Sequence, residues 1–153
     1  MIKEIENNTG LEQLTNEHEL VLRLCIRIRK GLHRKVNTQR IRDYVDWFRT
    51  HYLDPHFELE KEHIFPILGM NVRVKRALAN HRRINRLLSC SCEDLKVLSL
   101  LEEELAAYTR FEELILYRKI RAIVSPDKLM EIEQHLMAIP YNDQDWKDHF
   151  WKD

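Results

Sequence analysis

The sequence is short of the residues that make turns, and this narrows the fold class. Only three glycines and four prolines occur in 153 residues. A fold of many short strands needs many turns, and glycine and proline are the residues that favour them. A length near ~150 residues is typical of one domain with one core. We therefore expect an all-α protein whose residues 1–153 form a single domain.

An excess of charge of one sign is also absent, as are long apolar runs. Lys and Arg number 25 together, as do Asp and Glu, so no net field attracts nucleic acid or an anionic membrane. No apolar run approaches the ~20 residues that span a bilayer. The N-terminus MIKEIENNTG carries charges where a signal peptide needs an apolar stretch. We expect no membrane or nucleic-acid partner and a cytoplasmic location.

Cysteine is scarce as well. The three cysteines Cys25, Cys90 and Cys92 are an odd number, and one residue separates the last two. This spacing fits neither a disulfide framework nor the Cys-x2-Cys zinc knuckle. We interpret all three as reduced thiols.

Apolar residues at helical spacing are abundant. They form four stripes that recur every three or four residues, as one face of an α-helix does. The stripes are Leu14, Val21, Cys25, Ile28 and Leu32; Ile41, Val45, Phe48, Tyr52, Ile64 and Ile67; Val74, Ala77, Ile84 and Leu88; and Leu98, Leu101, Leu105, Ile115 and Leu116. They predict four long helices over about residues 11–124.

Proline marks where these helices bend or begin. Pro55 within the second stripe predicts a kink near residue 54, with Asp54 as the cap of a fresh helical segment. The segment Ser-Pro-Asp at 125–127 starts a short fifth helix, which we expect on the outside. The polar tail that completes residues 125–153 carries two tryptophans. These rings either dock on the bundle or contact a protein partner.

Histidines and glutamates occupy positions on these stripes where core residues are expected. They are His18 on the first stripe, His56 and Glu60 on the second, His81 on the third and Glu112 on the fourth. A buried, ionised carboxylate needs a partner, and a shared cation supplies one. Imidazole and carboxylate together favour iron, manganese or zinc. Two plainer accounts stay open: a single buried histidine is often an ordinary core residue, and Glu112 can pair with an arginine of the third helix.

The segments around these residues resemble the hemerythrin-like HHE cation-binding family. The family pattern is a His in helix one, His-x3-Glu in helix two, a His in helix three and His-x3-Glu in helix four. The resemblance rests on EHELVLRL, HFELEKEHIFPIL, NHRRINRLL and RFEELILY, in that order, and covers roughly residues 11–124. It implies an up-down four-helix bundle around a non-haem di-iron centre bridged by Glu60 and Glu112. Zinc or manganese can replace iron on purification.

Two positions depart from the family pattern. Asn85 stands where oxygen-carrying hemerythrins have a second histidine of helix three, which argues against a dioxygen carrier. Tyr108 stands where the second His-x3-Glu needs its histidine. A phenol has a pKa of about 10 in water, but a ferric ion is a strong enough charge to remove its proton. Tyr108 is therefore either a sixth ligand or a core aromatic, and the chain binds one or two metal ions.

Three functional hypotheses follow from the resemblance and the predicted ligands. The first is a non-haem iron protein that binds or senses dioxygen, nitric oxide or iron. The second is a di-iron oxidoreductase or an iron–sulfur cluster repair factor. No separate acid–base pair supports enzymatic turnover, so we favour a protein that is not an enzyme. The third is a metal-free helical interaction module that uses the cationic run Arg73, Lys75, Arg76, Arg82, Arg83 and Arg86. The alternative is that this run pairs with the acidic residues of the fourth helix, Glu102, Glu103, Glu104 and Glu113.

Overall fold

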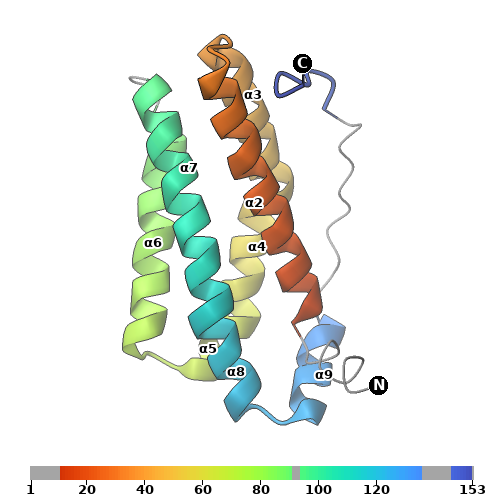
Figure 1. Ribbon diagram of the computed structural model, residues 1–153. Helices are drawn as coiled ribbons and strands as arrows, with labels where there is room; N and C mark the ends of the chain where they lie inside the picture. Colours follow the sequence, from red (N-terminus) through yellow and green to blue (C-terminus); the bar gives the residue numbers. More distant parts are fainter. Residues whose placement is uncertain (1–10, 91–93, 136–145, 153) are drawn as a thin grey trace.

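The computed structural model describes residues 11–90, 94–135 and 146–152, and every regular element in those ranges is a helix. Four rods run alternately up and down (Figure 1). The first rod is α2 (Glu12–His33) and the third is α6 (Val72–Ser89). The second rod consists of α3 (Thr38–Phe48), η1 (Arg49–Leu53), α4 (Asp54–Leu59), η2 (Glu60–Ile64) and α5 (Phe65–Leu68), where η denotes a π-helical turn. The fourth rod consists of α7 (Asp94–Phe111), η3 (Glu112–Tyr117) and α8 (Arg118–Ile123). The short helix α9 (Pro126–His135) follows. The predicted all-α, up-down four-helix bundle is confirmed.

Short turns join the first rod to the second and the second rod to the third. The side chain of Asn37 accepts a hydrogen bond from the amide of Gln39 at the start of α3. Asn71 does the same for the amide of Val74 at the start of α6. Gly69 ends the second rod with a φ of 68°, which glycine adopts without the steric cost that other residues incur. The chain therefore reverses direction between rods within a few residues.

Pro55 lies inside the second rod without breaking it. A new α-helical segment does begin at Asp54, with the proline in its first turn, as predicted. The predicted cap is wrong, because Asp54 has helical backbone angles and its carboxylate lies 3.6 Å from Arg49. The π-helical turn η1 ends at Leu53, two residues before the proline, and the rod continues through it.

A second π-helical turn, η3, changes which residues of the fourth rod face the core. Leu116 and Tyr117 are both 0% exposed, whereas Ile115 is 41% exposed. The prediction that Ile115 faces inward is wrong, and that for Leu116 is confirmed. A π turn contains an extra residue per turn, so the strict three-and-four spacing slips by one position there.

The bundle core joins all four rods, and the last elements complete it. α2 packs against α3 and α7, and α6 packs against α7. In α9, Leu129 and Ile132 are buried in the same core cluster. This short helix lies near the start of α2, at the end of the bundle rather than along its length (Figure 1).

The C-terminal residues 146–152 dock on the bundle. Phe150 and Trp151 are buried against Tyr44 of α3. The guanidinium of Arg27 lies 4.0 Å from the ring centre of Trp151, a cation–π distance. Of the two fates predicted for the tail, docking is the one that the described residues adopt.

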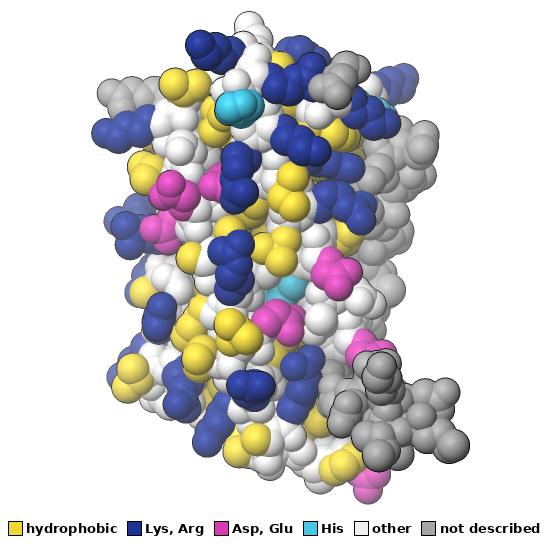
Figure 2. Space-filling model, in the orientation of Figure 1, with side chains coloured by type: hydrophobic (Ala, Val, Ile, Leu, Met, Phe, Trp, Pro, Cys, Tyr) yellow, Lys and Arg dark blue, Asp and Glu magenta, His cyan; other side chains and the backbone are white. Residues whose placement is uncertain are grey.

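Cationic side chains are spread among apolar and acidic ones on the face in Figure 2. Part of the cationic run on α6 is paired as predicted, since Arg83 lies 3.2 Å from Glu104 of α7. Glu102 instead pairs with Arg29 of α2. None of the helices in the described part of the chain is long and apolar enough to cross a bilayer.

Two of the three cysteines fall within the described residues, and both are free thiols. Burial, with a smaller contribution from the nearby carboxylate of Glu102, raises the pKa of Cys25 to about 12. Its thiol therefore stays protonated and packs as a small apolar group. Cys90 is partly exposed, and Cys92 lies outside the described residues.

Candidate metal centre

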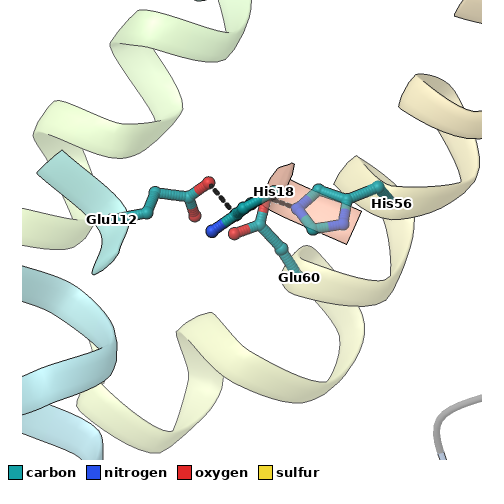
Figure 3. A group of neighbouring side chains, drawn as sticks. All are labelled: His18, His56, Glu60 and Glu112. Atoms are coloured by element: carbon teal, nitrogen blue, oxygen red, sulfur yellow. Dashed lines mark hydrogen bonds and ion pairs between the residues drawn. The ribbon is translucent and has the colours of Figure 1, made fainter. Parts of the chain in front are cut away.

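Four of the predicted ligands converge in the middle of the bundle (Figure 3). His18 comes from α2, His56 from α4, and Glu60 and Glu112 are the first residues of η2 and η3. One nitrogen or oxygen atom of each lies within 4.8 Å of those of the others. All four side chains are buried, with Glu60 at 0% exposed. Such a group is suited to hold a metal ion.

The two glutamates point their oxygens at the imidazoles. Oε1 of Glu112 lies 3.1 Å from Nε2 of His18, and Oε1 of Glu60 lies 3.4 Å from Nε2 of His56. Burial by itself raises the pKa of Glu60, but the imidazoles of His56, His81 and His18 together hold that pKa below its ordinary value. These three imidazoles therefore offset the effect of burial on Glu60. Glu112 pairs with His18, and among the described residues no arginine of α6 is in an ion pair with it, so the competing account of that glutamate is not supported.

Two further carboxylates hold the outer nitrogens of these histidines. Nδ1 of His56 lies 2.7 Å from Oε1 of Glu17, and Nδ1 of His18 lies 2.8 Å from Oε1 of Glu113. A neutral imidazole that donates its Nδ1 proton to a carboxylate keeps a lone pair on Nε2. Both Nε2 atoms face the centre, so this arrangement orients the two rings as metal ligands are oriented.

The sequence pattern did not predict a role for Glu17, and it marked Glu113 only as one of the acidic residues of the fourth helix. Glu17 is 7% exposed although its side chain is a carboxyl group. The hydrogen bond from His18 helps to hold the pKa of Glu113 below its ordinary value, against partial burial, which acts to raise it. A usable signal was present, because each is the sequence neighbour of a predicted ligand: Glu17 precedes His18 and Glu113 follows Glu112.

His81 and Tyr108 lie beside this group rather than within it. Nε2 of His81 is 3.5 Å from Oε1 of Glu60 and 2.6 Å from the hydroxyl of Tyr108. The ring of Phe57 stacks on that of His81, with 3.9 Å between ring centres. Nδ1 of His81 has no hydrogen-bond partner among the described residues. Burial, and then the negative charge of Glu60, raise the pKa of Tyr108 well above its ordinary value, so this phenol is protonated unless a cation is bound.

Tyr117 also reaches the centre, and sequence analysis did not predict it. Its hydroxyl donates to Oε2 of Glu60 at 2.9 Å and lies 3.3 Å from Nε2 of His18. Its ring stacks on that of His18, with 4.9 Å between centres and 12° between planes. Tyr117 follows Glu112 by five residues, a separation that only the π-helical turn brings onto the same face. Helical periodicity gives no signal for such a residue.

The unpaired atoms of the centre fit a cation. Nε2 of His56, Oε1 of Glu60 and Oε2 of Glu112 are buried and have no hydrogen-bond partner among the described residues. An unpaired buried acceptor is costly, and native structures rarely keep several together. All three atoms belong to ligand types that iron, manganese and zinc accept. A metal ion among them removes the cost.

A family model described as the hemerythrin HHE cation-binding domain matches residues 9–91, more than half of the chain. The chain belongs to the hemerythrin HHE cation-binding family. Comparison with curated proteins and with solved structures gave no match. The HHE match contains His18, His56, Glu60 and His81, whereas Tyr108 and Glu112 lie beyond it. The family match therefore indicates metal-ion binding as the function of the domain. The match does not extend to the fourth rod.

Proposed function

We propose that this HHE protein holds a non-haem iron centre and acts in binding or sensing dioxygen, nitric oxide or iron. The observation that supports it is the group of unpaired imidazole and carboxylate atoms of His56, Glu60 and Glu112 in the core. With His18 they form the principal metal position. His81, which lies near Glu60 and contacts the hydroxyl of Tyr108, provides a second position that shares this carboxylate.

The residues of the chain would bind the metal ion and orient its ligands, and the metal would provide the reactivity toward small molecules. Bound iron supplies a Lewis-acidic, redox-active centre to which small ligands bind. Glu17 and Glu113 keep the His56 and His18 rings in the orientation that presents Nε2. Phe57 and Phe65 lie against His81 and place apolar surface beside the second position. Ligands as small as dioxygen and nitric oxide suit such an enclosed, partly apolar centre.

A metal-free interaction module is less well supported. It leaves unexplained why Glu60 and Glu112, almost completely buried carboxylates, have oxygens without hydrogen-bond partners among the described residues. The cationic side chains of α6 that such a module would use are also partly engaged within the bundle. Arg83 pairs with Glu104, and the guanidinium of Arg76 lies 4.3 Å from the ring centre of Phe111.

Metal analysis of the full chain, purified after growth with added iron, tests the proposal. We expect one or two iron ions per chain and near-ultraviolet absorption that changes on addition of dioxygen or nitric oxide. Only a trace of any transition metal, both in this protein and in Glu60→Gln, would contradict it. Steady turnover of peroxide or nitric oxide by the iron-loaded protein would favour the oxidoreductase alternative over binding or sensing.

A further inference from the structure

Tyr117 contacts two proposed ligands directly, and neither the HHE pattern nor the stripe periodicity predicts it. It is 0% exposed. Its phenol is in hydrogen-bond contact with two of the proposed ligands, Glu60 and His18. Its partners therefore come from two other rods of the bundle, α2 and the rod that contains η2.

The single proton of this phenol has one suitable acceptor once a metal is bound. The Nδ1 atom of His18 is engaged with Glu113, so its Nε2 lone pair faces the centre and is needed for a cation. Oε2 of Glu60 is the closer acceptor, at 2.9 Å against 3.3 Å for the histidine nitrogen. The phenol therefore donates to Glu60.

This hydrogen bond makes the two oxygens of Glu60 unequal. Oε2 has a partner, whereas Oε1 has no hydrogen bond among the described residues. Oε1 is also the oxygen that lies between the two halves of the centre, 3.4 Å from Nε2 of His56 and 3.5 Å from Nε2 of His81. The carboxylate is thus held with its unpaired oxygen toward both imidazoles.

The local helix geometry that places Tyr117 here is not the default. In a regular α-helix the residues three and four positions after Glu112 are its neighbours on the same face. Those residues are Ile115, which is 41% exposed, and Leu116, which packs in the core cluster. The turn η3 starts at Glu112 and ends at Tyr117. Single π turns inside α-helices occur frequently at functional sites.

We propose that Tyr117 is a positioning residue of the metal centre, which fixes Glu60 by holding Oε2 so that Oε1 is presented to the cation. This inference rests on the proposed function, since it assumes that a metal binds at Glu60. It concerns the hydroxyl alone, because a phenylalanine ring in the same place keeps the stack on His18.

The test compares iron(II) affinity, measured by competition with a chromophoric chelator, in the full-length wild-type chain and in Tyr117→Phe. The matched control is Tyr44→Phe. Tyr44 is also 0% exposed, and its hydroxyl accepts a hydrogen bond from Arg27, far from the centre in the cluster that holds the C-terminal residues. Circular dichroism of the metal-free proteins verifies that all variants fold.

We expect Tyr117→Phe to weaken iron binding by about 10- to 100-fold, the usual effect of removing a group that orients a metal ligand. Tyr44→Phe should bind as the wild type does. In a Glu60→Gln background the Tyr117 substitution should have no further effect, because the phenol acts through that carboxylate.

Two results would overturn the inference alone: wild-type affinity in Tyr117→Phe, or the same loss in the Glu60→Gln background as in the wild type. Failure of the wild-type chain to bind iron would overturn the proposed function together with this inference. A second readout is the iron-dependent difference spectrum, iron-loaded minus metal-free protein, which should change in Tyr117→Phe and match the wild type in Tyr44→Phe.

Discussion

The two halves of the centre differ in what holds their histidines. In the half formed by His18 and His56, each outer nitrogen has a carboxylate partner, Glu113 or Glu17, and each inner nitrogen faces the centre. In the half formed by His81, the contacts of the outer and inner nitrogens are different. Its outer nitrogen has no hydrogen-bond partner within the described ranges, and its inner nitrogen is engaged by the hydroxyl of Tyr108.

This difference has a consequence for metal affinity. Carboxylates already hold the rings of His18 and His56 in the orientation that a metal ligand needs. His81 lacks such a partner among the described residues and must first give up or share its contact with Tyr108. Asn85, one turn after His81, adds no imidazole, and its amide oxygen is itself without a hydrogen-bond partner in the described part of the chain. We therefore expect the first half to bind metal tightly and the second half to bind it weakly.

The largest effect is expected at the residue that the halves share. Glu60→Gln keeps the size of the side chain but removes the charge that attracts the cation. We expect iron affinity to fall at least about 100-fold, or about 2.7 kcal/mol, with the second equivalent lost as well. Chelator competition and elemental analysis measure both quantities. Glu62→Gln is the control, since that glutamate lies two residues away and is exposed.

Substitution of one histidine in each half tests the asymmetry directly. His56→Gln should reduce iron affinity by about 100-fold at the tight position. His81→Gln should remove the weak equivalent and change the tight position by less than about 10-fold, because its contact with that position runs only through Glu60. Equal losses of iron affinity in the two variants would show that both halves bind metal equally well, and would contradict the expected difference between them.

The orienting carboxylates should have intermediate effects of unequal size. Glu17→Gln should weaken iron binding by about 10- to 100-fold, because His56 loses a buried partner. Glu113→Gln should cost about 10-fold or less, since 27% of that side chain is exposed and water can replace it beside His18. Glu19→Gln on the exposed face of α2 is the control. An affinity unchanged in both variants would show that the rings need no such support.

Much of this architecture was predictable from the sequence. Four rods follow from apolar spacing, and the five residues His18, His56, Glu60, His81 and Glu112 stand out because they are polar within apolar stripes. The structure buries all five. Burial of a polar side chain in an otherwise apolar face is costly, which is why the pattern carries information about a site.

What the sequence did not reveal depends on contacts between rods and on departures from α-helical spacing. Glu17 and Glu113 are adjacent to ligands in the chain, but only the approach of α2 to the second and fourth rods shows which ring each one holds. Tyr117 enters through a π-helical turn, which no periodicity of three and four residues anticipates. The docked position of Trp151 likewise needs the structure, because a polar tail has no periodic face.

The smallest effect on affinity, but a specific one on the spectrum, is expected for Tyr108→Phe. If the weak half takes up ferric iron, the cation lowers the pKa of Tyr108 from the raised value that burial and Glu60 impose, and the phenolate becomes a ligand. The ferric protein should then show a visible charge-transfer band that Tyr108→Phe lacks and Tyr117→Phe retains, while iron at the tight half is unchanged. Identical spectra for wild type and Tyr108→Phe would make Tyr108 a core aromatic that only holds His81. The second half would then have a single histidine to offer a metal beside the shared carboxylate of Glu60.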